Sequence, residues 1–250
     1  MNNKNGKVVL VTGGSRGIGS GIVKVLAETG YSIAFTYHTN KELAEELLKH
    51  IRKGTNKVIA VQMSMQDGES ITRALKTIDE ELGKIDILVN NAGIAQEKPF
   101  LSITKQDFGG MMDVNLKGPF ILCQAVIPDM VKKGWGRIVN ISSIGGQWGG
   151  FNQVHYAAAK AGLINLTRSL ARIYSPHGIT SNAIAPGLIQ TDMSEYEINS
   201  PQGKEKIKSI PAGRLGSKEE IGYLVKYLIS DEAAYITGQT INANGGMYFI

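Results

Sequence analysis

The stretch Val8-Val9-Leu10-Val11-Thr12-Gly13-Gly14-Ser15-Arg16-Gly17-Ile18-Gly19 decides the fold of this 250-residue chain. Its first four residues are all apolar, which is typical of a strand buried on both faces of a parallel sheet. The glycines that follow permit a tight turn and a close approach of the backbone to a ligand. A helical pattern over residues 19–29 comes next, and the N-terminus of such a helix attracts anions. The stretch therefore predicts the first half of a βαβ unit with a dinucleotide-binding turn.

The rest of the chain alternates short apolar runs with longer helical patterns. Further strands are predicted at residues 33–37, 58–61, 85–89, 137–141, 179–184 and 239–242. Helices are predicted at residues 41–52, at residues 68–82 and between the later strands. This alternation predicts an α/β fold: a Rossmann-type, doubly wound parallel β-sheet flanked by helices. We expect a single domain over residues 1–250, in which the irregular residues 188–211 form a substrate-binding flap.

Composition and charge exclude several classes of protein. The 27 Lys and Arg residues against 22 Asp and Glu give a net charge of +5, but the basic residues are scattered, so no nucleic-acid partner is expected. The single cysteine, Cys123, rules out an internal disulfide and favours a reducing compartment. The polar start carries no signal peptide, and no apolar run approaches the roughly 20 residues of a membrane span. We expect a soluble, cytoplasmic protein with no membrane partner. The four histidines show no metal-ligand spacing, and no metal is expected.

The end of the second predicted strand bears on which dinucleotide is bound. An NAD site places an acidic residue there for the ribose hydroxyls, whereas an NADP site needs neutral or basic groups for the 2′-phosphate. Tyr37 and His38 stand at this point, and no acid occurs before Glu42. Arg16 lies within the turn, where it would reach the phosphate, and Lys41 is either a second contact or a solvent-exposed helix start. NADP is favoured, with NAD as the alternative.

Three residue types in the second half of the chain suggest carbonyl chemistry. Tyr156 and Lys160 are four apart in a helical stretch, which places the phenol and the ammonium on one face. A neighbouring cation favours the phenolate, so we expect a lowered pKa for Tyr156. Ser143 follows the strand at residues 137–141, at the edge where this fold places its ligands, and would donate to a carbonyl oxygen.

These motifs together resemble the short-chain dehydrogenase/reductase family. The matching segments occur in order from about residue 7 to the C-terminus, at residues 12–19, 90–93, 115, 143, 156–160 and 186–187. The resemblance implies a catalytic tetrad of Asn115, Ser143, Tyr156 and Lys160. In it Ser143 orients the carbonyl, Tyr156 donates the proton, Lys160 also holds the nicotinamide ribose, and Asn115 supports a proton-relay water. Substrate contacts are expected from Ser143, Gln147 and Tyr156.

The predicted cofactor contacts come from the glycine turn and from the loops that follow the strands. They are Gly13, Ser15, Arg16, Gly17, Ile18, Gly19, Tyr37, His38, Ser64, Met65, Asn91, Ala92, Gly93, Tyr156, Lys160, Pro186, Gly187, Ile189 and Thr191. Ser64 stands where the family usually has an Asp that contacts adenine, so this chain departs from the pattern there.

Within the family, the chain is most similar to 3-oxoacyl-[acyl-carrier-protein] reductases. Residues 191–193, 212–216, 231–238 and 245–248 carry that likeness, whereas residues 134–143 and 146–147 also resemble acetoacetyl-CoA reductases. Both subgroups reduce a 3-oxoacyl thioester with NADPH in lipid metabolism, so fatty-acid-type biosynthesis is implied, with the carrier left open. Lys132, Lys133 and Arg172 are available to an acidic carrier protein, but Gly134 and His177 stand where further basic groups are expected.

Several alternatives stay open at this point. The same tetrad would serve another ketone or alcohol, and a non-catalytic dinucleotide sensor is the alternative from a different class. The resemblance also implies a homotetramer, for which the apolar C-terminal residues 247–250 would supply contacts.

Overall fold

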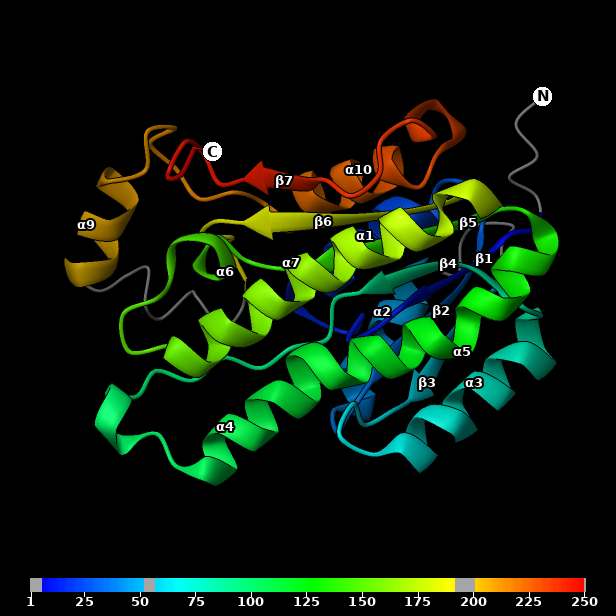
Figure 1. The fold of residues 1–250 in the computed structure, drawn as a ribbon, viewed down its shortest axis with the longest axis horizontal. Coiled ribbons are helices and arrows are strands. Elements are labelled where there is room, and N and C mark those ends of the chain that lie inside the picture. Colours follow the sequence, from blue (N-terminus) through cyan, green and yellow to red (C-terminus); the bar gives the residue numbers. More distant parts are fainter. Residues whose placement is uncertain (1–5, 52–56, 192–200, 250) are drawn as a thin grey trace.

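A computed structural model describes residues 6–51, 57–191 and 201–249 of the chain (Figure 1). Its centre is a seven-stranded sheet in which every pair of neighbouring strands is parallel, in the order β3-β2-β1-β4-β5-β6-β7. The strands are β1 (Val8–Val11), β2 (Ser32–Tyr37), β3 (Val58–Gln62), β4 (Ile85–Asn90), β5 (Gly136–Ile141), β6 (Ile179–Pro186) and β7 (Thr240–Ala243). The order reverses beside β1, so the ends of β1 and β4 form the crevice where such sheets bind ligands.

Helices cover both faces of the sheet, as predicted (Figure 1). One face carries α3 (Gly68–Leu82), α5 (Gly118–Lys133) and α7 (Val154–Tyr174), and the other carries α1 (Gly17–Ala27), α2 (Lys41–Ile51) and α10 (Lys218–Leu228). The shorter helices are α4 (Lys105–Met112), the π-helical turn η2 (Asp113–Lys117), α6 (Gly145–Trp148), α9 (Pro201–Lys208) and the 3-10 turns η1 (Phe100–Ser102), η3 (Ser175–His177) and η4 (Asp231–Ala233).

The core lies in two layers, one on each face of the sheet. Strands β1, β4, β5 and β6 are buried along their whole length, which explains why β1 is a continuous apolar run. The other three strands also carry buried polar side chains, among them Asn90, Asn140 and Asn182. Cys123 belongs to the layer beneath α5, where burial raises the pKa of its thiol to about 12. The thiol is therefore a small apolar core group, as predicted.

A row of buried, hydrogen-bonded polar side chains, here called the polar ladder, joins β4, β5 and α7. Ser143 follows β5, and Tyr156 and Lys160 lie on α7. Asn90 at the end of β4 donates from Nδ2 to Asn140 Oδ1 of β5 at 2.8 Å. Asn140 in turn donates from Nδ2 to Thr167 Oγ1 of α7 at 2.8 Å. Because unpaired polar groups are costly in a dry interior, this ladder fixes the register of α7 against the sheet.

The predicted element positions agree with the structure to within a few residues. The first helix begins at Gly17 rather than residue 19, and β6 extends to Pro186. The predicted flap at residues 188–211 lies partly outside the described residues, and its described second half contains α9. Across the described parts of the chain, no helix combines the length and apolar character that a membrane span requires.

Candidate active site

The glycine turn between β1 and α1 is shaped by close backbone contacts. Gly13 and Gly17 have positive φ angles of 62° and 54°, which side chains rarely tolerate. A Cβ at Gly19 would collide with the Gly13 carbonyl oxygen and lie 2.5 Å from Asn91 Nδ2. A Cβ at Gly13 would lie 2.9 Å from Ala92 Cα. The predicted turn residues are therefore held against the end of β4. Because its glycines have no side chains, their backbone is accessible from the crevice.

Thr12 and Asn91 bind the ends of β1 and β4 to each other. The Thr12 hydroxyl accepts hydrogen bonds from the backbone N–H groups of Asn91 and Ala92, at 3.0 and 2.9 Å. Asn91 Nδ2 donates back to the carbonyl oxygens of Thr12 and Gly13, at 2.9 and 3.0 Å. Thr36 of β2 adds a third support, because its Oγ1 accepts from Gly13 N–H at 3.0 Å. The Asn91 side chain is thus occupied in holding the turn.

The N-terminus of α1 suits an anionic ligand. Its first turn holds no acidic residue, so the positive end of the helix dipole is not neutralised locally. Arg16 is exposed at the N-cap, and its guanidinium has no hydrogen bond or ion pair with any described residue. Lys41, by contrast, lies 3.4 Å from Glu45 in an exposed ion pair. The pyrophosphate of a dinucleotide fits this turn. The glycines adopt positive φ angles and have no Cβ to obstruct a ligand, and the N-terminus of α1 attracts its negative charge.

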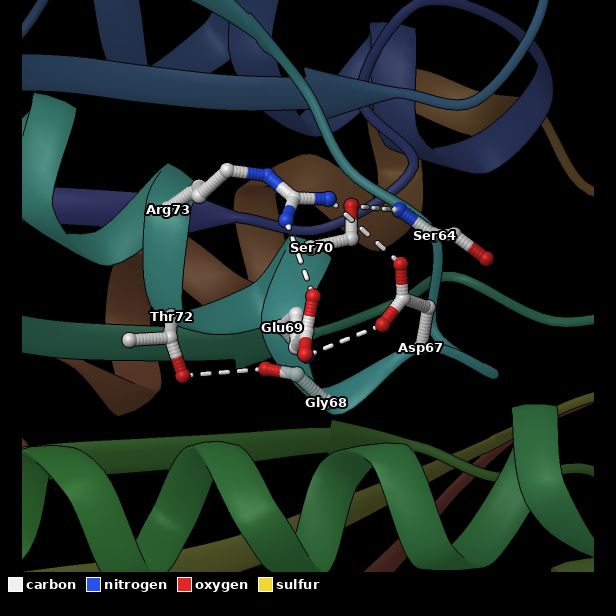
Figure 2. Close-up of polar contacts among 7 residues, drawn as sticks. All are labelled: Ser64, Asp67, Gly68, Glu69, Ser70, Thr72 and Arg73. Carbon is white, nitrogen blue, oxygen red and sulfur yellow. Dashed lines mark hydrogen bonds and ion pairs between the residues drawn. The ribbon is translucent and has the colours of Figure 1, made fainter.

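Figure 2 shows the loop after β3, where Ser64 replaces the family's usual acid. Ser64 N–H donates to Ser70 Oγ at 3.0 Å, and the Ser64 hydroxyl points away from the neighbouring ion pairs. Arg73 lies 3.5 Å from Asp67 and 3.4 Å from Glu69, so its charge is already paired. The Ser64 side chain is half-buried. Met65 beside it turns into the core, against the Gly118 position.

Tyr156 and Lys160 lie together on α7, as their spacing predicts. Lys160 is 4 % exposed, and its Nζ donates to the carbonyl oxygen of Ile141 at 2.8 Å. Burial lowers the pKa of this ammonium from 10.5 to about 8, because the charged form loses its hydration. Nζ also lies 5.7 Å from the centre of the Tyr156 ring. The buried ammonium of Lys160 therefore lies on the same side of α7 as the Tyr156 phenol.

The pKa of Tyr156 departs from the sequence expectation of a lowered value. Burial raises the pKa of the phenol, and a hydrogen bond with the Ser143 side chain offsets only part of that effect. Desolvation is the larger effect, and the Lys160 ammonium donates to the Ile141 carbonyl. Tyr156 is consequently protonated at neutral pH, the form that a proton donor needs.

Asn115 sits in the π-helical turn η2, between α4 and α5. Its Nδ2 donates to the carbonyl oxygens of Ile94 and Met111 at 3.0 and 3.1 Å. Its Oδ1 is buried and has no hydrogen-bond partner among the described residues. A Cβ at Gly93 would lie 2.7 Å from Asn115 Oδ1 and 3.5 Å from Lys160 Nζ. The free amide oxygen and the ammonium thus flank one small space beside Gly93, which fits a bound water.

Ser143 and Gln147 lie in the loop that follows β5. Ser143 Oγ accepts from Gly145 N–H at 3.1 Å and contacts the Tyr156 side chain. Gln147 Oε1 is buried without a partner among the described residues. A Cβ at Gly146 would lie 2.8 Å from the Lys160 backbone carbon, so this loop packs directly on α7. The structure therefore brings Ser143, Tyr156, Lys160 and Gln147 to one place.

The remaining predicted cofactor residues lie at the carboxyl ends of β2 and β6 or in the segments that follow them. Tyr37 ends β2 half-buried, and His38 follows it exposed. Pro186 and Gly187 end β6, where Gly187 packs so closely that a Cβ would lie 2.8 Å from Asn244 Cα. Ile189 is buried and bridges to Gly216, and a Cβ at Gly17 would lie 3.7 Å from Thr191 Cγ2. No group of three or more His, Cys, Asp or Glu side chains in the described ranges is placed to hold a metal.

Comparison with known proteins decides the family. A family model described as enoyl-(acyl carrier protein) reductase matches residues 13–248. The chain belongs to the short-chain dehydrogenase/reductase family. It is 43 % identical over 250 residues to the 3-oxoacyl-[acyl-carrier-protein] reductase FabG of Vibrio cholerae, covering 99 % of this chain and all of that one. It is 40 % identical over 242 residues to FabG of Staphylococcus aureus, covering 97 % and 98 % of the two chains.

A solved structure agrees with this assignment. A short chain dehydrogenase from Bacillus anthracis superposes with a TM-score of 0.88 at 36 % identity, covering 98 % of this chain and 97 % of the other. As a member of the short-chain dehydrogenase/reductase family, the protein is an oxidoreductase that uses a nicotinamide dinucleotide and acts on CH–OH and C=O groups.

Some contributors to this short-chain dehydrogenase/reductase site were not assigned from sequence. Thr12 belongs to the quoted turn, but its partners are 79 and 80 residues away. The carbonyl oxygens of Ile141 and Ile94, which hold Lys160 and Asn115, carry no side-chain signal at all. Only the position of Thr12, directly between strand and glycine turn, would have marked it.

Gly19→Ala tests the close contact inside the turn. The new methyl group would meet the Gly13 carbonyl and the Asn91 amide, so the turn must shift away from the end of β4. We expect affinity for the nicotinamide dinucleotide, measured with NADPH and with NADH by quenching of protein fluorescence, to fall by about 10-fold or more, roughly 1.4 kcal/mol. Gly68→Ala is the matched control, because its Cβ would meet nothing within 4 Å. Equal affinities for the two variants would contradict this account of the turn.

Proposed function

We propose that this protein reduces a 3-oxoacyl thioester, carried by acyl carrier protein, to the 3-hydroxyacyl thioester with NADPH, in fatty-acid-type biosynthesis. The observation that carries the proposal is the full-length identity of 40–43 % to two reductases of that name. The clustering of Ser143, Tyr156 and Lys160 supports it, because these groups suit protonation of a carbonyl oxygen. Acetoacetyl-CoA reduction is the alternative, and it differs in the carrier rather than in the chemistry.

Each residue of the proposed tetrad has a defined task. When bound, the nicotinamide supplies the hydride that the keto carbon receives. The Ser143 hydroxyl lies within hydrogen-bonding reach of Tyr156, so both side chains are placed to meet one substrate oxygen. Tyr156, kept protonated by burial, gives its proton to the developing alkoxide. The raised pKa therefore keeps Tyr156 in the protonated form that reduction requires at neutral pH.

Tyr156 must recover its proton after each turnover. Lys160 uses one of its three N–H donors on Ile141, which leaves two for the cofactor ribose and for a water. Asn115 Oδ1 is buried and unpartnered beside the same space, so it would accept from that water. We propose that Lys160 and Asn115 return the proton from solvent along this route.

A substrate panel tests the proposed reaction. The wild-type protein is assayed by NADPH oxidation with 3-oxoacyl carrier-protein thioesters, 3-oxoacyl-CoA thioesters and simple ketones. We expect the highest kcat/KM with the carrier-protein thioesters. Tyr156→Phe should lose at least about 1,000-fold in kcat, because the proton donor is gone, while NADPH still binds. Preference for CoA thioesters would favour the alternative carrier. No turnover of any carbonyl would support the dinucleotide-sensor alternative instead.

We propose NADP rather than NAD as the cofactor. No acidic side chain follows β2 before Glu42, and the Arg16 guanidinium is unpaired with any described residue beside the turn. Arg16→Ala should therefore raise the KM for NADPH by about 10-fold and leave the KM for NADH within about twofold, since charge-assisted bonds contribute about 1.5–3 kcal/mol. Lys41→Ala is the control, as Lys41 already pairs with Glu45. An equal change toward both cofactors would remove Arg16 from the 2′-phosphate site.

The pKa of Lys160 sets the expected pH dependence. The lysine is charged below about pH 8 and neutral above it, because burial has lowered its pKa to that value. Reduction requires the charged form for the proton relay, so kcat should fall as the pH rises through about 8. Tyr156 does not set this limb, since its pKa is raised. Rates at saturating NADPH between pH 6 and 10 would measure it, and a flat profile would exclude Lys160⁺ from the rate-limiting step.

We also propose a single catalytic domain with a flap over residues 188–211, and assembly as a homotetramer. Exposed apolar side chains support the assembly, among them Leu101 at 94 % and Phe249 at 79 % exposure. Burying such groups against another copy would remove apolar area from water.

A further inference from the structure

Residues 94–98, here called the strap, connect the Asn115 turn to the start of α7. At one end of the strap, the carbonyl oxygen of Ile94 accepts from Asn115 Nδ2 at 3.0 Å. At the other end, Lys98 N–H donates to the carbonyl oxygen of Asn152 at 2.6 Å, two residues before α7 begins. The strap therefore contacts both Asn115 of η2 and the start of α7, the helix that carries Tyr156.

Asp107, near the start of α4, clamps the strap from the side. Its carboxylate accepts from Lys98 Nζ at 2.5 Å and from Gln96 Nε2 at 3.2 Å. The same carboxylate accepts from the Thr104 N–H at 2.9 Å, as part of the capping box of α4. The bond from Lys98, followed by those from Thr104, holds the pKa of Asp107 well below its usual range. The clamp is thus charged at any pH where the protein works.

The hydrogen bond to Asp107 fixes the orientation of the Gln96 amide, that is, the directions in which its nitrogen and its oxygen face. Because Nε2 of Gln96 faces the acceptor oxygens of Asp107, its Oε1 faces His155, 2.9 Å from Nε2 of that ring. An amide oxygen only accepts, so His155 must donate from Nε2–H. His155 is 1 % exposed and directly precedes Tyr156. Its Nδ1 is buried and has no partner among the described residues, which agrees with an imidazole protonated at Nε2.

The start of α7 depends on such outside contacts. Gln153 at the N-cap makes no side-chain capping bond, and Asn152 before it has a φ of 54°, a left-handed conformation that costs free energy outside glycine. Local sequence therefore does little to fix the first turn of α7, which carries Tyr156. The bonds from the strap to Asn152 and His155 supply this restraint.

We propose that Gln96 and His155 are positioning residues for the proton donor. Their hydrogen bond sets the place of Tyr156 relative to Gly93 and Asn115, and Asp107 sets the orientation of Gln96. This inference rests on the proposed function, because it assigns the two residues to the step in which Tyr156 donates its proton. Neither side chain contacts the substrate in this account, and both act through the first turn of α7.

Four variants test the proposal in the assay with the best substrate of the panel. Gln96→Leu and His155→Leu each remove the bond and should lower kcat about 10- to 100-fold, as expected when a reacting group is displaced by a fraction of an ångström. The Kd for NADPH should stay within about twofold. His155→Gln keeps an N–H donor at similar reach and should recover kcat to within about threefold of wild type. Gln153→Leu is the control at the N-cap of α7, because it removes only an exposed 3.3 Å bond to Glu97 of the strap.

The outcomes separate a positioning role from a merely structural one. Loss of kcat with unchanged NADPH binding, rescued by His155→Gln, supports the proposal. Unchanged kcat in Gln96→Leu, parallel loss of NADPH affinity, or no rescue by His155→Gln would each overturn it. A wild-type protein that reduces no carbonyl contradicts the proposed function instead, and a second measurement then decides the inference.

That second measurement reads the histidine directly. The chain has four histidines, so long-range ¹⁵N–¹H spectra of the histidine-labelled protein contain few signals. We expect His155 in the Nε2–H form in the wild type, and a mixture of tautomers or a shifted Nε2 signal in Gln96→Leu. The wild-type Nε2–H form together with that change supports the Gln96 bond. A wild-type ring protonated at Nδ1 alone, or an unchanged His155 signal in Gln96→Leu, would overturn it.

Discussion

The Thr12 hydroxyl holds together two strand ends on which the whole crevice depends. By accepting from two successive backbone N–H groups after β4, it brings residues 91–93 against the glycine turn. Asn91 and Thr36 hold the same turn, and its Gly13 and Gly19 positions lie in close contact with residues 91 and 92. From Gly93 the same chain continues into the space shared by Asn115 and Lys160. A single side-chain oxygen thus links the surface that suits a pyrophosphate to the groups that suit proton transfer.

Burial tunes the chemistry of this site more than charge pairing does. The Lys160 ammonium is taken from water and given a backbone carbonyl, so its pKa falls to about 8. The same dry surroundings raise the pKa of Tyr156. One environment therefore moves the two pKa values apart and reverses their order, so the Lys160 ammonium is the stronger acid and proton transfer from it to a Tyr156 phenolate is favourable. The polar ladder of Asn90, Asn140 and Thr167 maintains that environment by fixing α7 on the sheet.

The sequence predicted the fold and the grouping of the site well, for physical reasons. Apolar runs such as residues 8–11, followed at once by a glycine turn, indicate doubly buried strands, and the Tyr156–Lys160 spacing places both groups on one helix face. Features that depend on long-range backbone contacts were not predictable. The partners of Thr12 lie 79 and 80 residues away, and the Ile141 carbonyl that holds Lys160 has no signature. The pKa of Tyr156 was mistaken in direction because the spacing shows the cation but not the burial.

The π-helical turn at Asp113–Lys117 constrains the number of residues between α4 and α5. A π-turn holds one residue more than an α-turn, so α4 and α5 are out of phase by about 100°. That offset lets Asn115 face the crevice while Leu122, Cys123 and Val126 face the core. Deleting one residue here would restore an uninterrupted α-helix, but it would rotate one of these faces away from its partner. The number of residues in this segment is therefore constrained as well as the identity of Asn115.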